Sequence, residues 1–537
     1  MKKFYLLLFN LSLASMVWGQ WTNDYNVNTL AAESQTNDIQ SIGTNDGKTY
    51  IIFWDEDAGY DLRVQLIDEN GYALFGSNGM LVNAVADNGT WTATRSNVVD
   101  ADGNLYVGFT ATNDGNGYVN KISPDGTQLY GENGIIIPDA WDLKLLALAD
   151  GGVLVGWLGG ANGMLMKYDA TGTPVWDTAK TVGSGNSSLP FSAIGELALL
   201  SDGSFIVIVH GKATSWMIDS TVSAFRFDED GDEIWSVSPI SNQTLASNRR
   251  YPLLQDGDVV YLGYYGSTGF RFDSFLQRIN PDGELPWGVD GADFSLNDTF
   301  YEMTTSIAFD ENSDYIWSSS NICNNTQTEY GQYIQKFDKE TGERLLGENA
   351  KEIFPVSAQN WIAVGDLQLV DDQPLFLFSN DISNGVNSIQ LGVVFLDSEG
   401  DFKWEDEYLM IATSSGNKFR YDFTKNIDGQ SVAIWAENRE GGNYAFAQNI
   451  LIEEETQSVV DLNKTKTTIY PNPSNGMVYV QSESIVVKIE VFDWNGKKIL
   501  QKSNSKSVNL NSLPNGVYLI KTTLNDQSVK VNKLIKK

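Results

Sequence analysis

The sequence contains very little cysteine and histidine. It has 1 Cys and 1 His in 537 residues, so we expect no intramolecular disulfide and no metal site built from several histidines. A Ser-His-Asp or Cys-His catalytic arrangement would need His210, which lies inside a predicted strand and is expected to be an ordinary strand residue. We identify no catalytic residues from the sequence.

Basic residues are also scarce. The chain has 36 Lys and Arg against 69 Asp and Glu, a net charge of −33 at pH 7. Residues 463–537 reverse this balance with 12 basic and 4 acidic residues, so the body of the chain is more acidic still. Such a body repels nucleic acid and anionic membranes, and we expect neither as a partner.

Long hydrophobic runs are missing except near the start. Lys2 and Lys3 precede an apolar run from Phe4 to Leu13, which is shorter than the ~20 residues needed to span a bilayer. Residues 1–19 are therefore predicted to be a secretory signal peptide, cleaved near Gly19, and the mature protein is expected to have no transmembrane segment.

The sequence is rich in a repeated pair of turns. An acidic turn, usually Asp-Gly, recurs eight times at intervals of roughly 50 to 60 residues, beginning at positions 46, 102, 150, 202, 256, 311, 371 and 428. A second turn ends in Gly, and four residues later comes a bulky residue: Phe75, Tyr130, Trp176, Trp235, Trp287, Leu346 or Trp404. Asp-Gly between short apolar runs predicts a β-hairpin, so each repeat predicts two hairpins. Cations before the second turn are expected on a solvated strand face: Lys121, Lys167, Arg226 and Arg278.

Four antiparallel strands per repeat predict an all-β fold, an eight-bladed β-propeller over residues 20–453. The eighth repeat lacks its fourth strand. The segment around Trp21 lies before the first turn and is not needed by the first repeat. We expect the mature N-terminus to supply the missing strand and close the ring, which removes an open sheet edge. The bulky residues after the second turns are expected to pack between blades.

This turn-Gly-x-x-x-Trp pattern resembles the tryptophan-docking motif of quinoprotein-type eight-bladed propellers. The resemblance implies the fold and not the chemistry. The quinone dehydrogenases carry an adjacent cysteine pair, and this chain has Cys323 alone, so we do not expect pyrroloquinoline quinone.

The pattern changes near the C-terminus. Residues 454–466 are predicted to be a linker, and alternating strands with Asn-Gly turns predict a small C-terminal β-sandwich over residues 467–537. This segment closely resembles the type A C-terminal sorting domain of the type IX secretion system, through Tyr470, Pro471, Asn472, Pro473, Asn475, Gly476, Asn515, Gly516, Val517 and Tyr518. The resemblance implies the type IX secretion machinery as a partner, passage through the periplasm, and a secreted or outer cell-surface location.

A binding face is predicted from strand direction. Both tight turns of a blade must lie on one face of the ring, so the second-to-third and fourth-to-first connections share the other, here called the variable-loop face. Residues 318–332 and 380–388 are predicted to be long loops on it. Aromatic residues stand near the start of innermost strands, with arginines close by, and could bind sugars or cations. The predicted ligand-binding residues are Trp91, Trp141, Phe191, Tyr301, Trp361, Phe419, Arg95, Arg250 and Arg420, and the alternative is that the aromatics only fill gaps between inner strands.

One metal site is a candidate. Asp228, Asp230 and Asp232 have the alternate spacing typical of calcium ligands, although the same acids would also serve a repeat turn through side-chain hydrogen bonds. We expect no other cofactor.

Two functions fit these observations. The first is a secreted or cell-surface binding or adhesion propeller, expected to be monomeric, that recognises a glycan, polymer or protein. The second is a polysaccharide-active hydrolase or lyase that uses Asp and Glu without His. Because no catalytic site is recognisable, the first is favoured.

Overall fold

The structure is a computed structural model that describes residues 21–537 apart from 23, 85–94, 112–113, 215–220, 246–250, 268–270, 382–388, 440, 453–467, 483–484, 494–496 and 526–528. The predicted signal peptide and linker lie outside these residues. The chain divides into two compact units, Met1–Glu453 and Glu454–Lys537. In the described parts the regular structure is β-strand, apart from one short 3-10 helix, η1 (Glu56–Ala58).

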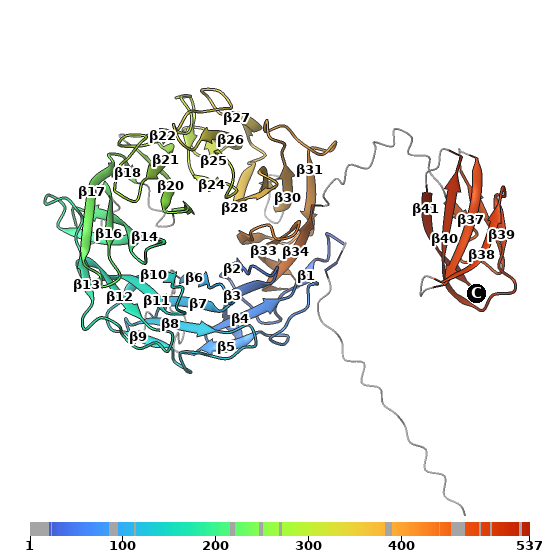
Figure 1. The fold of residues 1–537 in the computed structure, drawn as a ribbon, viewed down its shortest axis with the longest axis horizontal. Coiled ribbons are helices and arrows are strands. Elements are labelled where there is room, and N and C mark those ends of the chain that lie inside the picture. Colours follow the sequence, from blue (N-terminus) through green and yellow to red (C-terminus); the bar gives the residue numbers. More distant parts are fainter. Residues whose placement is uncertain are drawn as a thin grey trace, which may run out of the picture. The chain divides into compact units, whose positions relative to one another are not determined.

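The first unit is a ring of eight antiparallel sheets, the blades (Figure 1). Blade 1 is built, from the centre outward, of β2 (Ile39–Gly43), β3 (Thr49–Asp55), β4 (Asp61–Ile67) and β5 (Met80–Asn83). Blade 2 has β6 (Arg95–Val99), β7 (Leu105–Thr110), β8 (Gly117–Ile122) and β9 (Ile135–Ile137). Blade 3 has β10 (Trp141–Ala147), β11 (Val153–Gly159), β12 (Asn162–Tyr168) and β13 (Lys180–Val182). Blade 4 has β14 (Phe191–Leu199), β15 (Phe205–Lys212), β16 (Thr221–Phe227) and β17 (Glu233–Ser241).

The remaining blades follow the same order, with two broken inner strands. Blade 5 has β18 (Thr244–Leu245) and β19 (Leu253–Asp256) inside, then β20 (Val259–Ser267), β21 (Asp273–Ile279) and β22 (Ala292–Asp293). Blade 6 has β23 (Tyr301–Glu302) and β24 (Ser306–Ala308) inside, then β25 (Tyr315–Cys323), β26 (Tyr330–Asp338) and β27 (Lys351–Ser357). Blade 7 has β28 (Ile362–Val370), β29 (Gln373–Asp381), β30 (Ile389–Phe395) and β31 (Tyr408–Ala412). Blade 8 has β32 (Lys418–Phe423), β33 (Gln430–Arg439), β34 (Gly442–Leu451) and β1 (Thr29–Leu30). The eight-bladed prediction is confirmed.

Neighbouring blades are joined by the bulky residues that follow the second turns of blades 1 to 6, and by Trp21 where the ring closes. Trp404, after the second turn of blade 7, lies beside Phe395 of the same blade. The indole Nε1 of Trp176 donates to the carbonyl oxygen of Glu229, in the second turn of the next blade, at 3.2 Å. A Cβ on Gly231 of that turn would fall 2.9 Å from the Trp176 ring, and Gly231 has a φ of 77°, so glycine alone suits the position. The same contact recurs at Trp21 and Gly71, Phe75 and Gly126, Tyr130 and Gly172, Trp235 and Gly283, Trp287 and Gly342, and Leu346 and Gly400. Packing between blades is confirmed.

Three of the four cations on the third strands, Lys121, Arg226 and Arg278, bind the next blade, and for them the prediction of a solvated face is wrong. Lys167 is half-buried. Lys121 is 4% exposed and its Nζ donates to a carbonyl oxygen in the first turn of blade 3 at 2.8 Å. Arg226 Nη1 donates to Pro281 O at 2.7 Å, and Arg278 Nη1 donates to Lys339 O at 2.9 Å. These side chains cross to the next blade because the carbonyl groups of its turns need donors.

The ring closes at β1, which lies beside β34 (Figure 1). Its two residues pair antiparallel with Ala447 and Phe446. Trp21 precedes this strand and takes the docking position instead, because its Nε1 donates to Glu69 O of blade 1 at 2.9 Å and its ring covers Gly71. The predicted closure by the N-terminus is confirmed.

A buried ion network holds the segment that precedes β1. Glu437 and Lys418 have fully buried side chains 3.6 Å apart. Arg439 pairs with Glu437 at 2.9 Å, and donates to Val27 O at 2.5 Å and to Asn28 Oδ1 at 3.0 Å. Burial lowers the pKa of Lys418; burial also opposes ionisation of Glu437, but hydrogen bonds led by Arg439 hold its pKa below the ordinary value. Blade 8 therefore binds the closing segment through charge as well as through backbone pairing.

The second unit is a small sandwich of two sheets. One sheet has β35 (Thr468–Tyr470), β36 (Met477–Gln481) and β39 (Ser507–Asn509). The other has β37 (Val486–Asp493), β38 (Lys498–Ser503), β40 (Gly516–Leu524) and β41 (Val529–Lys536). Val478, Ile489 and Ile520, from both sheets, are completely buried in one shared core. The second unit therefore has a core of its own.

Deleting residues 20–28 is expected to open the ring. The deletion removes the docking ring of Trp21 and the Asn28 side chain held by Arg439. The two residues of β1 remain, but they lose the segment that holds them against β34, so the edge of that strand becomes easier to expose. We expect a lower midpoint in chemical denaturation, together with oligomers in light scattering. Trp235→Ala is the matched control, because it removes one docking contact inside a closed ring; it should cost roughly 3 kcal/mol, the lower end of the range for large core aromatics, and stay monomeric. Equal monomer content of the two variants would contradict the closure role of the N-terminus.

Candidate binding face

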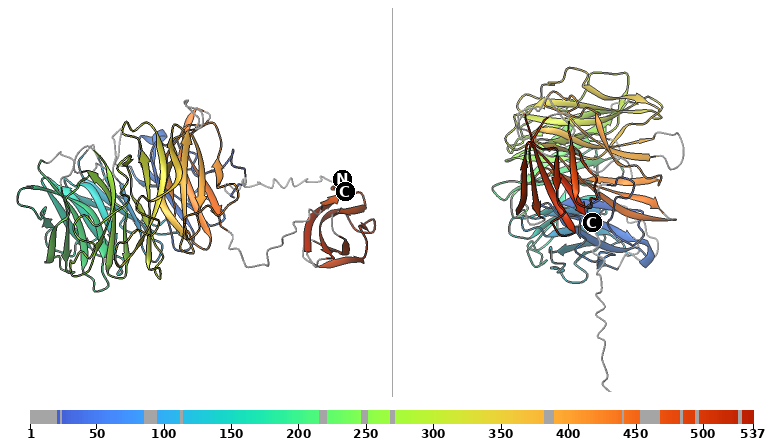
Figure 2. Two further views of the ribbon diagram at one scale, coloured as in Figure 1. Left: turned by 90° about the horizontal axis from the view of Figure 1, so that it is seen from above. Right: turned by 90° about the vertical axis from the view of Figure 1, so that its right-hand side faces the viewer.

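The strands of each blade run between the two faces of the ring, which Figure 2 shows from the side. Each blade's first and second tight turns share one face, so the variable-loop face carries the other connections. The segment 318–332 is not the long loop predicted, because β25 continues to Cys323 and β26 begins at Tyr330. Its polar residues pair in register as strands, and only six residues remain between them. Most of 380–388 lies outside the described residues.

The predicted aromatic residues fall at equivalent places on this face. Trp141, Phe191 and Tyr301 are the first residues of the inner strands β10, β14 and β23. Phe419 is the second residue of β32, and Trp361 immediately precedes β28. Trp91 lies outside the described residues. The fourth-to-first connections therefore bring this set to one face of the ring.

Their surroundings differ sharply. Trp141 is 44% exposed, whereas Trp361 is 8% exposed. Trp361 stacks on Phe354 with ring centroids 4.2 Å apart, inside the core between blades 6 and 7. The other three are half-buried: Phe191, Tyr301 and Phe419. Trp361 thus fills a gap between strands, whereas Trp141 is exposed enough to contact a ligand.

The backbone of the inner strands is irregular near two of these residues. The pairing of β10 shifts between Trp141 and Lys144, where Asp142 has a φ of 52°. The pairing of β32 shifts between Phe419 and Asp422, where Arg420 has a φ of 54°. A bulge of this kind adds residues to one strand and changes the direction of neighbouring side chains. The repeat pattern in the sequence does not reveal it.

The predicted arginines are only partly described. Arg420 is exposed, and its Nε lies 3.6 Å from Asp38 Oδ1 of blade 1. Arg95 pairs with Phe109 in the backbone of blade 2, but its side chain lies outside what the structure describes, as does all of Arg250. The variable-loop face therefore presents Arg420 as a cation already paired with a carboxylate.

Where blade 5 meets blade 6, the face carries a group of carboxyls that the sequence did not single out. Glu302 is 2% exposed and accepts the backbone N–H of Ser274 at 2.8 Å. Asp273 pairs with Arg271 at 2.5 Å, and Asp293 accepts the backbone N–H of Ser295. The ring of the predicted residue Tyr301 lies beside the ring of Phe272, with centroids 6.1 Å apart. We call Arg271, Phe272, Asp273, Asp293, Tyr301 and Glu302 the blade 5–6 cluster.

The carboxyls of this cluster resist ionisation. Burial raises the pKa of Asp293 to about 6, with a further contribution from Asp273. Burial also raises the pKa of Glu302 well above its ordinary value, and that of Asp273 less strongly, against the attraction of Arg271. Pairs of shifted carboxyls are typical of functional sites. The only signal in the sequence was Tyr301, since acidic residues are common along the whole chain.

The calcium candidate is a repeat turn. Asp228 Oδ1 accepts the backbone N–H of Asp230 at 3.0 Å and of Asp232 at 2.8 Å. Asp232 also pairs with Lys180 at 3.0 Å, and Asp169 makes the same turn without the acidic spacing. In the part of the chain that the structure describes, no group of three or more His, Cys, Asp or Glu is placed to hold a metal ion. Calcium at this turn stays a prediction.

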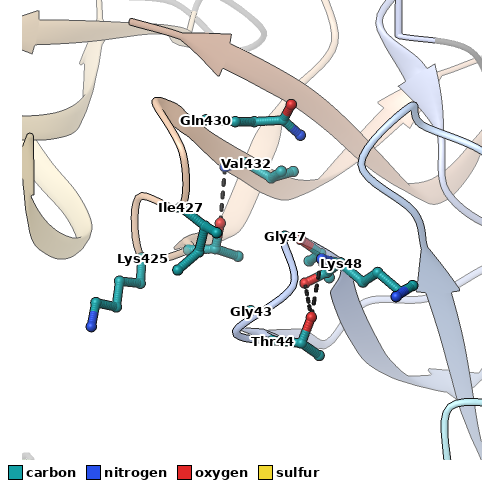
Figure 3. A pocket seen from close by; sticks show the side chains of 10 residues that line it. Gly43, Thr44, Gly47, Lys48, Lys425, Ile427, Gln430 and Val432 are labelled. Carbon is teal, nitrogen blue, oxygen red and sulfur yellow. Dashed lines mark hydrogen bonds between the residues drawn. The ribbon is translucent and has the colours of Figure 1, made fainter. Parts of the chain in front are cut away.

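A small hollow lies on the tight-turn face, where blade 8 meets blade 1 (Figure 3). Its polar groups bond to each other: Thr44 Oγ1 accepts the backbone N–H of Lys48 at 3.0 Å, and Thr424 Oγ1 accepts that of Val432 at 2.9 Å. Hydrogen bonds within each blade thus use both hydroxyls. We interpret this hollow as the seam of the closed ring and not as a ligand site.

The residues of the predicted sorting motif hold the second unit together. The Asn472 side chain donates to Lys533 O at 2.8 Å and accepts the Ile535 N–H at 2.9 Å, which fixes the segment after β35 to β41. A Cβ on Gly476 would fall 1.6 Å from the Asn511 Oδ1. The remaining residues of the motif lie around these contacts and at the start of β40: Tyr470, Pro471, Pro473, Asn475, Asn515, Gly516, Val517 and Tyr518.

No curated protein matches the chain. Among solved structures, puromycin hydrolase is 13% identical, with 78% of this chain and 61% of that chain covered and a TM-score of 0.42. Prolyl oligopeptidase B from Galerina marginata is 12% identical, with coverages of 76% and 55% and a TM-score of 0.43. The β-propeller domain of the trilobed protease from Pyrococcus furiosus is 10% identical, with coverages of 80% and 99% and a TM-score of 0.37. The chain thus spans about three fifths of the length of puromycin hydrolase, and likenesses at this level carry no information about activity.

The C-terminal unit does match a protein family. Residues 468–537 match the secretion system C-terminal sorting domain. Within the described residues, no helix is long and apolar enough to cross a bilayer. The second unit is therefore a type IX secretion C-terminal sorting domain, and the chain that carries it is exported through the periplasm to the cell surface or the medium.

Proposed function

We propose that the propeller is a secreted or surface-displayed binding module whose variable-loop face recognises a glycan, a polymer or a protein. Export by the type IX machinery delivers the ring to the outside of the cell, where such ligands are found. The ring is a rigid support for loops, which is the common arrangement for recognition sites.

The observation that carries the proposal is the contrast between the two faces. On the tight-turn face, docking rings and cations from one blade occupy the turn carbonyls of the next, as for Trp176 and Arg226. On the variable-loop face, Trp141 is exposed and Phe191, Tyr301 and Phe419 are half-exposed at equivalent positions. Aromatic rings of this kind supply large contact area at little cost in conformational entropy.

A panel of oligosaccharides tests the binding function against the catalytic one. The mature propeller, residues 20–453, should give a saturable heat signal in calorimetry with at least one glycan. Release of reducing ends from the same panel should stay at the background of a heat-denatured sample. Saturable binding without release supports the binding module, whereas release without accumulation of a complex contradicts it.

Removing the sorting domain should leave a folded propeller in the periplasm. The reason is that the two units have separate cores, while the export signal lies in the second alone. Chains ending at residue 453 should show native protease resistance in periplasmic fractions and no surface labelling. Gly476→Val in the full chain is the matched variant, because its side chain would collide with Asn511; it should be retained in the same way. Normal surface labelling of either chain would refute the assignment of the export signal.

The second candidate function is a polysaccharide hydrolase or lyase, and the blade 5–6 cluster favours it. A carboxyl whose pKa lies near 6, as for Asp293, is suited to give a proton at neutral pH. Asp273 and Glu302 lie close enough to influence it. If this function holds, Asp293→Asn should abolish release of reducing ends.

The same cluster predicts how stability changes with pH. The pKa of Asp293 is higher in the folded protein than in the unfolded chain, so its protonated carboxyl favours the folded state. This contribution to the free energy of unfolding is fully present below the pKa of the unfolded chain, near 4, and is lost as pH rises through about 6. The melting temperature of the Asp293→Asn variant should therefore be at least about 2 °C above that of the wild type at pH 8 and equal to it at pH 4. Asparagine keeps an oxygen for the Ser295 N–H, so packing is preserved. Melting curves that differ by the same amount at both pH values would show that burial does not destabilise the charged form.

A further inference from the structure

Trp141 is an exposed tryptophan of the ring. Of the tryptophan side chains that the structure describes, it alone is largely open to solvent, at 44%. An exposed indole gives up favourable burial of a large apolar surface. Its position therefore needs an explanation other than packing.

The backbone around Trp141 is turned on both sides and anchored in between. Asp139 and Asp142 on either side have positive φ values of 51° and 52°. Between them, Ala140 is completely buried, and its carbonyl oxygen accepts a hydrogen bond from Thr110 Oγ1 at 2.9 Å. The turned backbone on both sides of a buried anchor thus holds the Cα of Trp141 at this face of the ring.

Gly115, in the second-to-third connection of blade 2, lies beside the indole. A Cβ on Gly115 would lie 3.9 Å from Cζ2 of Trp141, so this glycine meets the ring with backbone alone. The loop itself is closed by hydrogen bonds from Gly115 N to Ala111 O at 2.8 Å and from Ala111 N to Asn116 O at 2.9 Å. Gly115 therefore lies against the edge of the indole, while 44% of Trp141 stays exposed.

A hydrogen-bonded carboxylate directly precedes Gly115. Asp114 precedes Gly115 and is exposed, and it accepts the Tyr118 hydroxyl at 2.6 Å and the backbone N–H of Asn116 at 2.9 Å. Partial burial works against its ionisation, but these hydrogen bonds hold the pKa of Asp114 below its ordinary value. It is therefore an ionised acceptor that remains available to a hydroxyl donor.

Building on the proposed binding function, we infer that Trp141 and Asp114 form a subsite for one uncharged sugar ring of a glycan. The apolar face of a pyranose covers the indole, and a ring hydroxyl donates to Asp114. Acidic sugars are excluded, because Asp114 and the acidic body of the ring repel uronate and sulfate groups. The inferred ligand class is thus a neutral hexose or pentose polymer.

Calorimetry with defined probes tests this subsite. The mature propeller is titrated with cellohexaose, laminarihexaose, mannohexaose and xylohexaose, with a chitosan hexamer as the cationic probe and an oligogalacturonate as the anionic one. We expect a neutral probe to bind, Trp141→Ala to weaken it roughly 30-fold or more, the loss typical of an anchoring aromatic, and Trp141→Tyr to recover part of that loss. Asp114→Asn should weaken the same probe without a change in salt dependence.

Trp361→Ala is the matched control, because it removes a tryptophan from the equivalent place in blade 7 where the side chain is buried. It should lower the melting temperature and leave binding at low temperature unchanged, whereas Trp141→Ala should leave melting unchanged. Binding of a neutral probe that survives Trp141→Ala would overturn the subsite and leave the binding function standing. Binding confined to the chitosan hexamer and abolished by salt would overturn the neutral class. Failure of every probe to bind the wild type would refute glycan recognition altogether.

Discussion

One contact, a bulky side chain laid over the turn glycine of the next blade, holds the ring together. It is made seven times, and in most copies the side chain also donates to a carbonyl of the same turn, as at Trp235 and Pro281. Each copy ties two blades through a glycine with positive φ, a conformation that other residues rarely adopt. A protein without disulfides can in this way stabilise a large ring, because the interblade packing is repeated at seven of the eight boundaries and not concentrated in one core.

Much of this architecture could be predicted because it depends on local chemistry. Asp-Gly and Pro-Asp-Gly turns specify hairpins by themselves, and counting them yields the blades and the missing strand. The docking residues follow the turn glycine at constant spacing, so their role could be inferred together with the turns. What could not be inferred was the direction of Lys121 and Arg226, because whether a strand face meets solvent or another blade is set by the curvature of the ring.

The site was harder to predict because its differences arise from irregular backbone. Trp141 and Trp361 occupy equivalent places in the repeat, yet one is open and the other packs on Phe354. Both inner strands carry a register shift, next to Trp141 in blade 3 but only beyond Val364 in blade 7, and such shifts leave no mark in a pattern of turns. The blade 5–6 cluster was missed for another reason: in a chain this acidic, Asp293 and Glu302 do not stand out until the fold buries them.

The pairing of the first propeller strand with the last has a consequence for the order of biogenesis. Leu30 pairs with Phe446, so β1 stays unpaired until nearly the whole ring has been synthesised. Contacts this distant in sequence form late. The export signal follows the same final strand, so a chain interrupted upstream has neither a closed ring nor a tail. Because the sorting domain lies after the last propeller strand, every chain that carries it also contains all the strands needed to close the ring. The export machinery therefore recognises only chains long enough to have formed a closed propeller.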